Sequence, residues 1–217
     1  MLVKNYMTRH PIMIPPTTPA AEAQKIMAET KIRHLPIIGD GKRPMGLITR
    51  ERLRIPSADL GSLNVWEIAR YLSEMKVRDL MVKEPDLITI SPDATLEDAA
   101  GLMVEHKIGC LLVVEENVVV GILSETDMLS QLAGLLGGHV SGLRLIVRVP
   151  EKVGGYARVM NTFWNRGWGL YATGSVPAPR KPGFWDMVLK VRDASREEVL
   201  AALEEVKEAE IVDVRET

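Results

Sequence analysis

The stretch Gly121-Ile122-Leu123-Ser124-Glu125-Thr126-Asp127 decides the fold of this 217-residue chain, because a version of it occurs twice. Its counterpart is Gly46-Leu47-Ile48-Thr49-Arg50-Glu51-Arg52. In both, a glycine and two apolar residues lead to a hydroxyl residue, which is typical of a buried strand that ends where a helix begins. A repeat of this kind has to be traced before secondary structure is assigned, because the repeat sets the fold.

The repeat extends well upstream of this stretch. Val3–Leu53 matches Val77–Leu129, and each copy opens with valine, three residues and methionine, then reaches a proline and a helical segment. A short β-branched run follows at 32–38 and at 108–114, which indicates a buried strand. The pattern predicts the order strand, helix, strand, strand, helix in each copy.

The repeats divide the chain into predicted domains. We expect repeat 1 at residues 1–59, a connecting helix at 60–76, repeat 2 at 77–138 and a different domain at 142–217. Glycines between repeat 2 and the last domain indicate the break. Seven of the ten aromatic residues lie after residue 150, so the composition changes with the architecture.

The last segment alternates strands and helices differently. Its patterns predict strands at 143–149, 170–175, 185–191 and 211–214, and helices at 155–165 and 195–207. Ser195 with Glu198 three residues later is a capping-box pattern. The order βαββαβ predicts an antiparallel sheet with both helices on one face.

Composition excludes several classes of protein. The chain has 27 basic and 29 acidic residues, so it offers no general positive field for nucleic acid. Its longest apolar runs are far below the roughly 20 residues of a membrane span, and its first residues lack a signal-peptide pattern, so we expect a cytoplasmic protein. One cysteine and four scattered histidines predict neither a disulfide nor a metal site.

Together these motifs resemble a pair of CBS domains, the Bateman module, and the segment from residue 142 is similar to an ACT domain. The arrangement resembles regulatory proteins of the acetoin utilization (AcuB) type. The resemblance implies an α/β (α+β) fold, with a pseudo-twofold CBS pair followed by a βαββαβ ferredoxin-like ACT domain. It also implies a homodimer, and a cleft in the CBS pair that holds AMP, ADP, ATP or, alternatively, S-adenosylmethionine.

Ser124 and Asp127 have the chemistry for such a ligand. A carboxylate at the start of a helix can accept both hydroxyls of a ribose, while the serine and the first helical amides can donate to a phosphate. The same two residues would equally serve as an ordinary helix cap. Repeat 1 carries Arg52 at the position of Asp127, and a guanidinium has donors only, so we expect its site to be altered or empty.

The resemblance implies further contacts. Arg33 and His34 would reach from repeat 1 to the phosphates, small residues at 109 and 110 would let the backbone approach, and apolar residues would line the adenine. Arg33 as a solvated side chain, His34 as a hydrogen-bonded edge histidine and Cys110 as a small core residue are the alternatives. The full set of implied nucleotide-binding residues is Asp127, Ser124, Arg33, His34, Ile108, Gly109, Cys110, Ala94 and Ala99.

For the ACT-like segment, the resemblance implies an amino-acid ligand at the loop Val153-Gly154-Gly155-Tyr156. A tight turn into a helix would need these glycines as well. Gly169 stands where many ligand-binding ACT domains have asparagine, so the alternative is a sheet that mainly pairs subunits. We expect Trp164 and Trp185 in the core.

A regulatory, ligand-sensing protein is the class that fits best. The sequence shows no nucleophile with a base, no phosphate-binding loop of Walker type and no nucleic-acid reading module, so we predict neither an enzyme nor a nucleic-acid binder. The AcuB resemblance implies a link to acetoin or related carbon metabolism, and allosteric signalling through the ACT domain. The alternative is a dimerising interaction scaffold with vestigial ligand sites.

Overall fold

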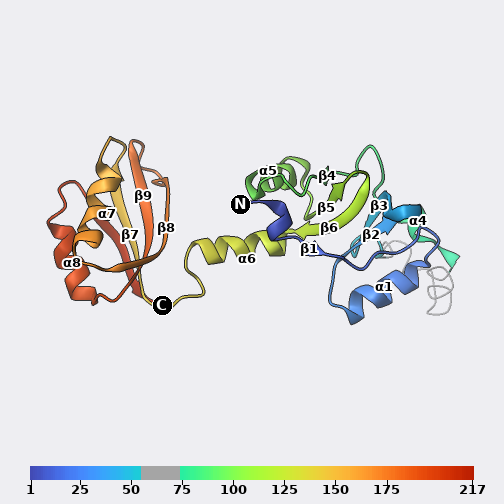
Figure 1. Cartoon of the computed structure of the whole chain (residues 1–217), viewed down its shortest axis with the longest axis horizontal. Helices are drawn as coiled ribbons and strands as arrows, with labels where there is room; N and C mark the ends of the chain where they lie inside the picture. The colour runs from blue at the N-terminus through green and yellow to red at the C-terminus, as the bar shows by residue number, and fades with distance from the viewer. Residues whose placement is uncertain (55–73) are drawn as a thin grey trace. The chain divides into compact units, whose positions relative to one another are not determined.

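The computed structural model describes residues 1–54 and 74–217, which form two compact units, Met1–Met128 and Leu129–Thr217 (Figure 1). The units divide within helix α6 (Glu125–Leu135), ahead of the break expected at 138–142. Most of the connecting helix predicted at 60–76 lies outside the described residues. Among the described residues, no helix has the length and apolar character needed to cross a membrane.

Repeat 2 is built around a four-stranded sheet in the order β1-β6-β5-β4. β5 (Cys110–Glu115) and β6 (Val118–Ser124) are antiparallel, and β4 (Thr89–Ile90) runs parallel to β5. Helix α5 (Leu96–His106) begins at Thr95, whose hydroxyl accepts from the Asp98 amide in a capping box. The predicted strand, helix, strand, strand, helix order is confirmed here.

Repeat 1 has the same plan. Helix α1 (Ala20–Glu29) precedes the antiparallel strands β2 (His34–Ile38) and β3 (Pro44–Thr49), with a short 3₁₀ turn, η2 (Asp40–Lys42), between them. The strand predicted at 32–38 is therefore confirmed. A helix was expected after Thr49, but residues 50–54 form a turn and the following residues lie outside the described part.

The opening segment of each repeat packs on the other repeat. η1 (Val3–Asn5) and β1 (Thr8–Arg9) lie on repeat 2, where β1 pairs with β6. α4 (Val77–Leu80) inserts Val77 into the core of repeat 1. Because each copy contributes its opening segment to its partner, the two repeats form one folding unit.

Two glycines make this exchange sterically feasible. A Cβ atom on Gly121 would lie 2.5 Å from Met7 Sδ, and one on Gly46 would lie 2.5 Å from the Val82 carbonyl oxygen. Real Cβ atoms do not approach this closely. The glycine that opens the repeated motif is therefore required by close packing of the exchanged segment.

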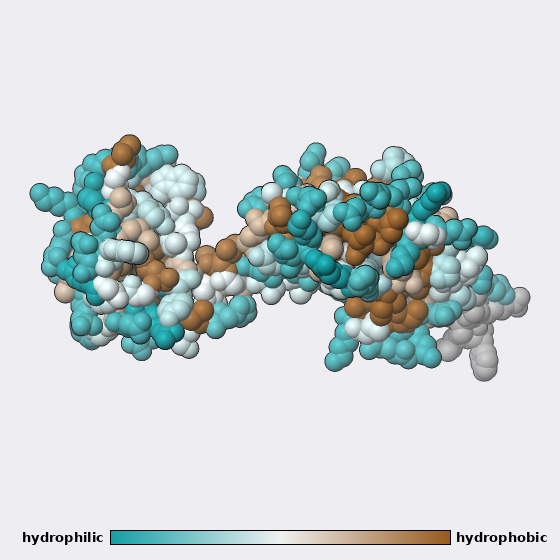
Figure 2. All heavy atoms as spheres, in the orientation of Figure 1, coloured by the Kyte–Doolittle hydropathy of each residue, from teal (hydrophilic) through white to brown (hydrophobic). Residues whose placement is uncertain are grey.

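The sheets of the two repeats meet in a shared apolar layer. Leu47 from repeat 1 packs with Cys110, Leu112 and Val119 from repeat 2, and all four are buried. On the face that Figure 2 shows, apolar residues also gather at the surface over the strands of this unit. The junction between the two repeats is therefore apolar at its centre.

The second unit has the predicted βαββαβ order. Its strands β7 (Leu143–Pro150), β8 (Gly169–Pro177), β9 (Phe184–Arg192) and β10 (Glu210–Glu216) form an antiparallel sheet in the order β10-β7-β9-β8. Helices α7 (Gly155–Asn165) and α8 (Arg196–Glu204) cover one face (Figure 1). The capping box of Ser195 and Glu198 is present, and α8 ends three residues before the predicted Lys207.

One core prediction in this unit is wrong. Trp164 is 84% exposed, whereas Trp185 is partly buried against the core. The buried side of α7 is formed by Val159 and Phe163, and a residue directly after Phe163 points about 100° away on a helix. Apolar character alone did not indicate which side of α7 carries each aromatic residue.

Candidate functional site

Two cavities lie between the repeats, and we name each after its residue at the third position beyond the strand end. The Asp127 cavity has a volume of about 470 Å³ and is lined by the end of β6, the start of α6 and the segments around His10 and Arg33. The Arg52 cavity has a volume of about 460 Å³ and is lined by the end of β3, the start of β5 and the segment 82–88. Both are large enough for a small organic ligand.

Ser124 and Asp127 form a reciprocal cap at the start of α6. The carboxylate Oδ2 of Asp127 accepts from the Ser124 amide at 2.8 Å and from the Ser124 hydroxyl at 2.6 Å, and the Asp127 amide donates to Ser124 Oγ at 3.3 Å. Within the described part of the chain, no hydrogen bond uses Asp127 Oδ1. The cap therefore orients the carboxylate while leaving one of its oxygens available to a ligand.

Two cations, Lys31 and Arg33, line the Asp127 cavity. His10 and His34 line it as well, and Asp127 is the carboxylate among its lining residues. Arg33 Nη2 donates to Thr126 Oγ1 at 3.3 Å, so this side chain reaches from repeat 1 to the first turn of α6. Arg33 and Asp127 therefore line the same cavity, one from each repeat.

Three other predicted residues lie elsewhere. Ile108, Gly109 and Cys110 line the Arg52 cavity, together with Arg33 and His34, which line both cavities. The reason is the pseudo-twofold relation of the repeats, because of which the start of β5 in repeat 2 and the end of β3 in repeat 1 line the same cavity. The single site expected from the sequence is therefore spread over two cavities.

The two predicted alanines line neither cavity. Ala99 is fully buried in the core of repeat 2, and Ala94 packs against the same core. Ala99 lies on the inner side of α5, where its small side chain lets the helix pack closely on the sheet. The structure gives neither residue contact with a cavity ligand.

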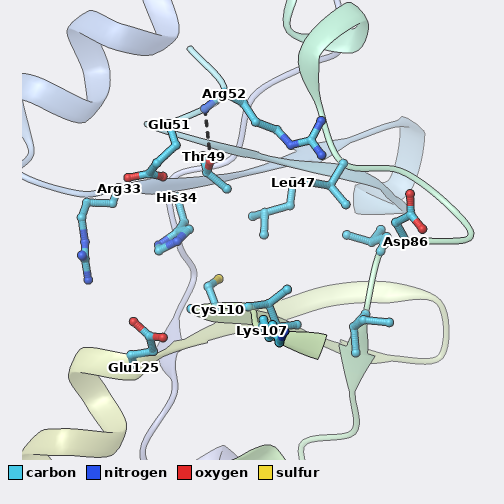
Figure 3. Close-up of a pocket in the computed structure, with 15 residues that line it drawn as sticks. Arg33, His34, Leu47, Thr49, Glu51, Arg52, Asp86, Lys107, Cys110 and Glu125 are labelled. Carbon is cyan, nitrogen blue, oxygen red and sulfur yellow. Dashed lines mark hydrogen bonds between the residues drawn. The ribbon is translucent and has the colours of Figure 1, made fainter. Parts of the chain in front are cut away.

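The Arg52 cavity differs at the acid position. The Arg52 amide donates to Thr49 Oγ1 at 3.4 Å, as the Asp127 amide does to Ser124 Oγ, and Arg52 Nη1 donates to the Leu80 carbonyl at 3.3 Å. Figure 3 shows Thr49 and Arg52 above the cavity, with Cys110 and Glu125 below it. The guanidinium takes the place of the carboxylate found in the Asp127 cavity.

Burial shifts two titratable groups at this junction. Desolvation and the nearby Arg33 guanidinium lower the pKa of His34, against a smaller opposing effect of Glu51 and Glu125. Burial, with the charges of Asp127 and Glu125, raises the pKa of the Cys110 thiol to about 12. Near neutral pH His34 is therefore uncharged, and Cys110 is a protonated core residue without nucleophilic character.

In the second unit, the predicted loop borders a cavity of about 520 Å³. Val153 and Tyr156 line it, along with Lys152 and Trp185, whereas Gly154 and Gly155 do not. Gly154 has φ of 88° at the start of α7, so its role in the turn requires glycine. The Tyr156 hydroxyl hydrogen-bonds to the Thr173 hydroxyl on β8.

Two segments, residues 3–55 and 77–134, match the family described as CBS domain, and together they cover just over half of the chain. The chain belongs to the CBS domain family. The two matched segments coincide with the two repeats, so the Asp127 and Arg52 cavities both lie within a CBS pair.

Relatives share the CBS pair within longer proteins. The chain is 32% identical over 136 residues to a homoserine O-acetyltransferase of Methanocorpusculum labreanum, covering 61% of this chain and 24% of the relative. It is 30% identical over 126 residues to an inosine-5'-monophosphate dehydrogenase of Korarchaeum cryptofilum, covering 58% of this chain and 23% of the relative. The chain thus spans about a quarter of the length of these two relatives.

Solved structures show the same CBS pair. A Vibrio cholerae chain described as an acetoin utilization protein (AcuB) has a TM-score of 0.53 and 29% identity, covering 64% of this chain and 95% of that one. A CBS domain pair in complex with 5'-methylthioadenosine and S-adenosyl-L-methionine has a TM-score of 0.50 and 26% identity, covering 62% of this chain and all of that one. Each similarity extends over nearly the whole length of the solved chain and over less than two thirds of this one.

The sequence analysis missed several residues of the Asp127 cavity in this CBS pair. Thr8 and His10 belong to the opening segment of repeat 1, which lies on repeat 2, and Lys31 and Thr126 are neighbours of predicted residues. The sequence could have indicated Lys31 and Thr126, because they lie close in the chain to the predicted residues Arg33 and Asp127. No such indication was available for His10, because its placement depends on the exchange of opening segments.

Proposed function

We propose that this chain is a non-catalytic regulatory protein whose CBS pair binds an adenosine nucleotide, AMP, ADP or ATP, in the Asp127 cavity. The observation that carries the proposal is that the Ser124–Asp127 cap lines one cavity together with Arg33 and Lys31. A carboxylate that accepts from ribose hydroxyls and cations that bind phosphate are the two groups that a nucleotide requires.

The charge of the cavity supports a phosphate-bearing ligand. Lys31 and Arg33 outnumber Asp127, and His10 and His34 add further nitrogen donors or acceptors. The related CBS pair that binds 5'-methylthioadenosine and S-adenosyl-L-methionine supports the adenosyl class. S-adenosylmethionine is the alternative ligand, but its sulfonium adds a positive charge that Lys31 and Arg33 would oppose.

Calorimetric titration of AMP and ATP into the Asp127→Ala variant tests the site. Loss of a charge-assisted hydrogen-bond pair costs about 1.5 to 3 kcal/mol, so we expect a dissociation constant raised about ten- to a hundredfold. Asp98→Ala is the matched control, because Asp98 makes the same capping box with Thr95 but lines neither cavity. Unchanged nucleotide binding in Asp127→Ala would overturn the assignment.

Helix α6 supports a route for the signal. Asp127 lies in its first turn, and the same helix continues from Leu129 into the second unit. A ligand that binds one arrangement of the α6 start better than another can shift that equilibrium by its differential affinity. We propose that nucleotide occupancy in the CBS pair is signalled to residues 142–217 through this helix.

We propose further that residues 142–217 form an ACT-like domain. The βαββαβ order and the antiparallel sheet support a ferredoxin-like fold, and the cavity beside Val153 and Tyr156 supports an amino-acid ligand at that loop. Homodimerisation, a cytoplasmic location and a link to acetoin or related carbon metabolism complete the proposal. The similarity to the Vibrio cholerae chain supports the metabolic link.

A dimerising interaction scaffold is the second candidate function. The 84% exposure of Trp164 favours it, because a large aromatic side chain at the surface is a frequent interface anchor. Thermal shift with AMP, ADP, ATP, S-adenosylmethionine and amino acids separates the two functions. A sensor should gain about 2.7 kcal/mol of stability from a ligand at a hundred times its dissociation constant, whereas a scaffold should respond to none.

A further inference from the structure

The Arg52 cavity has a charge pattern that suits a different ligand from the nucleotide. Three cations line it, namely Arg33, Arg52 and Lys107. Three carboxylates balance them, namely Glu51, Asp86 and Glu125. The Asp127 cavity, by contrast, combines two cations with one carboxylate. A ligand with both charges and no net charge matches the balanced cavity, since each of its charges meets the opposite sign.

The Arg52 cavity also has a guanidinium where the Asp127 cavity has its carboxylate. Arg52 has only donors, and the Thr49 hydroxyl already accepts from the Arg52 amide. One guanidinium hydrogen bond, from Nη1 to the Leu80 carbonyl, is present among the described residues. The remaining donors of Arg52 can form a bidentate pair with a ligand carboxylate, which is the geometry that arginine favours.

An apolar wall lies beside these charges. Leu47, Val82, Leu87, Ile88 and Ile108 all line the cavity, and Leu47 belongs to the buried junction of the repeats. Figure 3 shows Leu47 between Arg52 above and Lys107 below, with Asp86 to one side. A bound molecule would therefore place an apolar part on the wall while its charged groups face the rim.

We propose that the Arg52 cavity binds a small zwitterion, an α-amino acid with an apolar side chain. Its carboxylate would bind Arg52, its ammonium group would bind Asp86, and its side chain would pack on Leu47 and Ile108. At about 460 Å³ the cavity has room for an aromatic amino acid. The proposal adds a second ligand to the CBS pair and does not depend on nucleotide binding in the Asp127 cavity.

Three matched probes test the ligand class by calorimetric titration of the full chain. L-Phenylalanine carries both charges, 3-phenylpropanoate lacks the ammonium group and 2-phenylethylamine lacks the carboxylate. We expect L-phenylalanine to bind at least about tenfold more tightly than either of the other two, because each loses one charge-assisted contact. Equal or tighter binding of 3-phenylpropanoate would show a site for simple anions, and absence of L-phenylalanine binding would show no amino-acid site; either overturns the proposal.

Variants locate the amino acid. Arg52→Gln and Asp86→Asn should each weaken L-phenylalanine binding at least about tenfold. The control variants Arg54→Gln and Asp40→Asn make the same chemical changes at exposed residues outside this cavity, and they should bind as the unchanged protein does. All four side chains are exposed, so thermal unfolding should confirm intact folding in each variant.

The same variants keep this proposal separate from the proposed nucleotide site. Arg52→Gln should bind AMP within about twofold of the unchanged protein, because Arg52 does not line the Asp127 cavity. If L-phenylalanine binds equally well to Arg52→Gln and Asp86→Asn, the amino acid occupies another site, such as the cavity beside Tyr156, and the proposal is wrong. Failure of AMP to bind would contradict the nucleotide site alone.

Discussion

At the scale of single residues, Asp127 and Arg52 occupy equivalent positions in the two repeats but give the two cavities opposite charges there. Both follow a strand that ends in a hydroxyl residue, and both hydroxyls accept from the backbone amide three residues later. The local backbone is therefore similar, and the side chain alone changes an acceptor into a donor. The two repeats thus carry a carboxylate and a guanidinium at equivalent positions.

Cys110 should be unreactive in the folded protein. Its pKa of about 12 leaves only about one thiolate in ten thousand near pH 8, and its side chain is 2% exposed. We expect a thiol reagent such as dithionitrobenzoate to modify the native protein slowly, and the urea-unfolded protein completely and fast. Rapid modification of the native protein, at a rate near that of the unfolded chain, would contradict the buried position.

His34 should make stability depend on pH. Its pKa is lower in the folded protein than its ordinary value of about 6.5, so the unfolded chain binds the proton more readily. The free energy of unfolding should therefore fall as the pH decreases below about 6.5, and level off below the folded-state pKa. Arg33, Glu51 and Glu125 are the charges that act on this group.

Urea denaturation at about pH 7.5 and about pH 5.5 measures the His34 contribution. The His34→Gln variant should lose part of the difference between the two free energies of unfolding. His106→Gln changes an exposed histidine in the last turn of α5 and serves as the control. An equal pH dependence in the unchanged protein and in His34→Gln would argue against a depressed histidine pKa.

At the scale of elements, the exchanged opening segments hold the CBS pair together. β1 pairs with β6 of the other repeat, and Val82 makes the corresponding bridge to Leu47. The two contacts occupy equivalent edges of the two sheets. At Gly46 the exchanged backbone passes too close to the strand for a Cβ atom, and at Gly121 an added Cβ atom would displace the Met7 side chain.

Gly46→Ala should destabilise the CBS pair by about 1 to 3 kcal/mol, because its Cβ would lie 2.5 Å from a backbone oxygen that cannot turn away. Gly101→Ala is the control within α5, where an added Cβ meets no atom within 4 Å. There, alanine should stabilise the helix by up to about 1 kcal/mol. Urea denaturation measures both, and a Gly46→Ala variant as stable as the original would refute the close approach.

At the scale of the whole molecule, two compact units with separate cores share one helix. The core of Leu129–Thr217 is built from its own sheet and helices, and Val159, Phe163 and Leu189 are almost fully buried in it. The CBS pair has its own cores around Leu35 and Leu111. Because α6 begins beside the Asp127 cavity, one helix leads from this cavity into the second unit.

Saturating AMP should change the hydrogen exchange of residues 136–142, which follow α6. Gly134→Pro interrupts the helix beyond the cavity, so this variant should bind AMP with nearly unchanged affinity but lose the change in exchange. Gly134→Ala should keep both, since an added Cβ there meets no atom within 4 Å. Identical exchange with and without AMP in the unchanged protein would exclude signalling through α6.

The sequence by itself determined the repeat, the element order of repeat 2 and of the second unit, and the chemical difference between Asp127 and Arg52, because periodicity, caps and functional groups are local properties. The tertiary structure alone decided that His10 joins the Asp127 cavity and that Ile108 joins the Arg52 cavity. It also decided that Ala99 is buried and Trp164 is exposed. These placements depend on the exchange of opening segments and on which side of each helix meets a sheet. Both are set by packing between residues far apart in the chain, which no local pattern records.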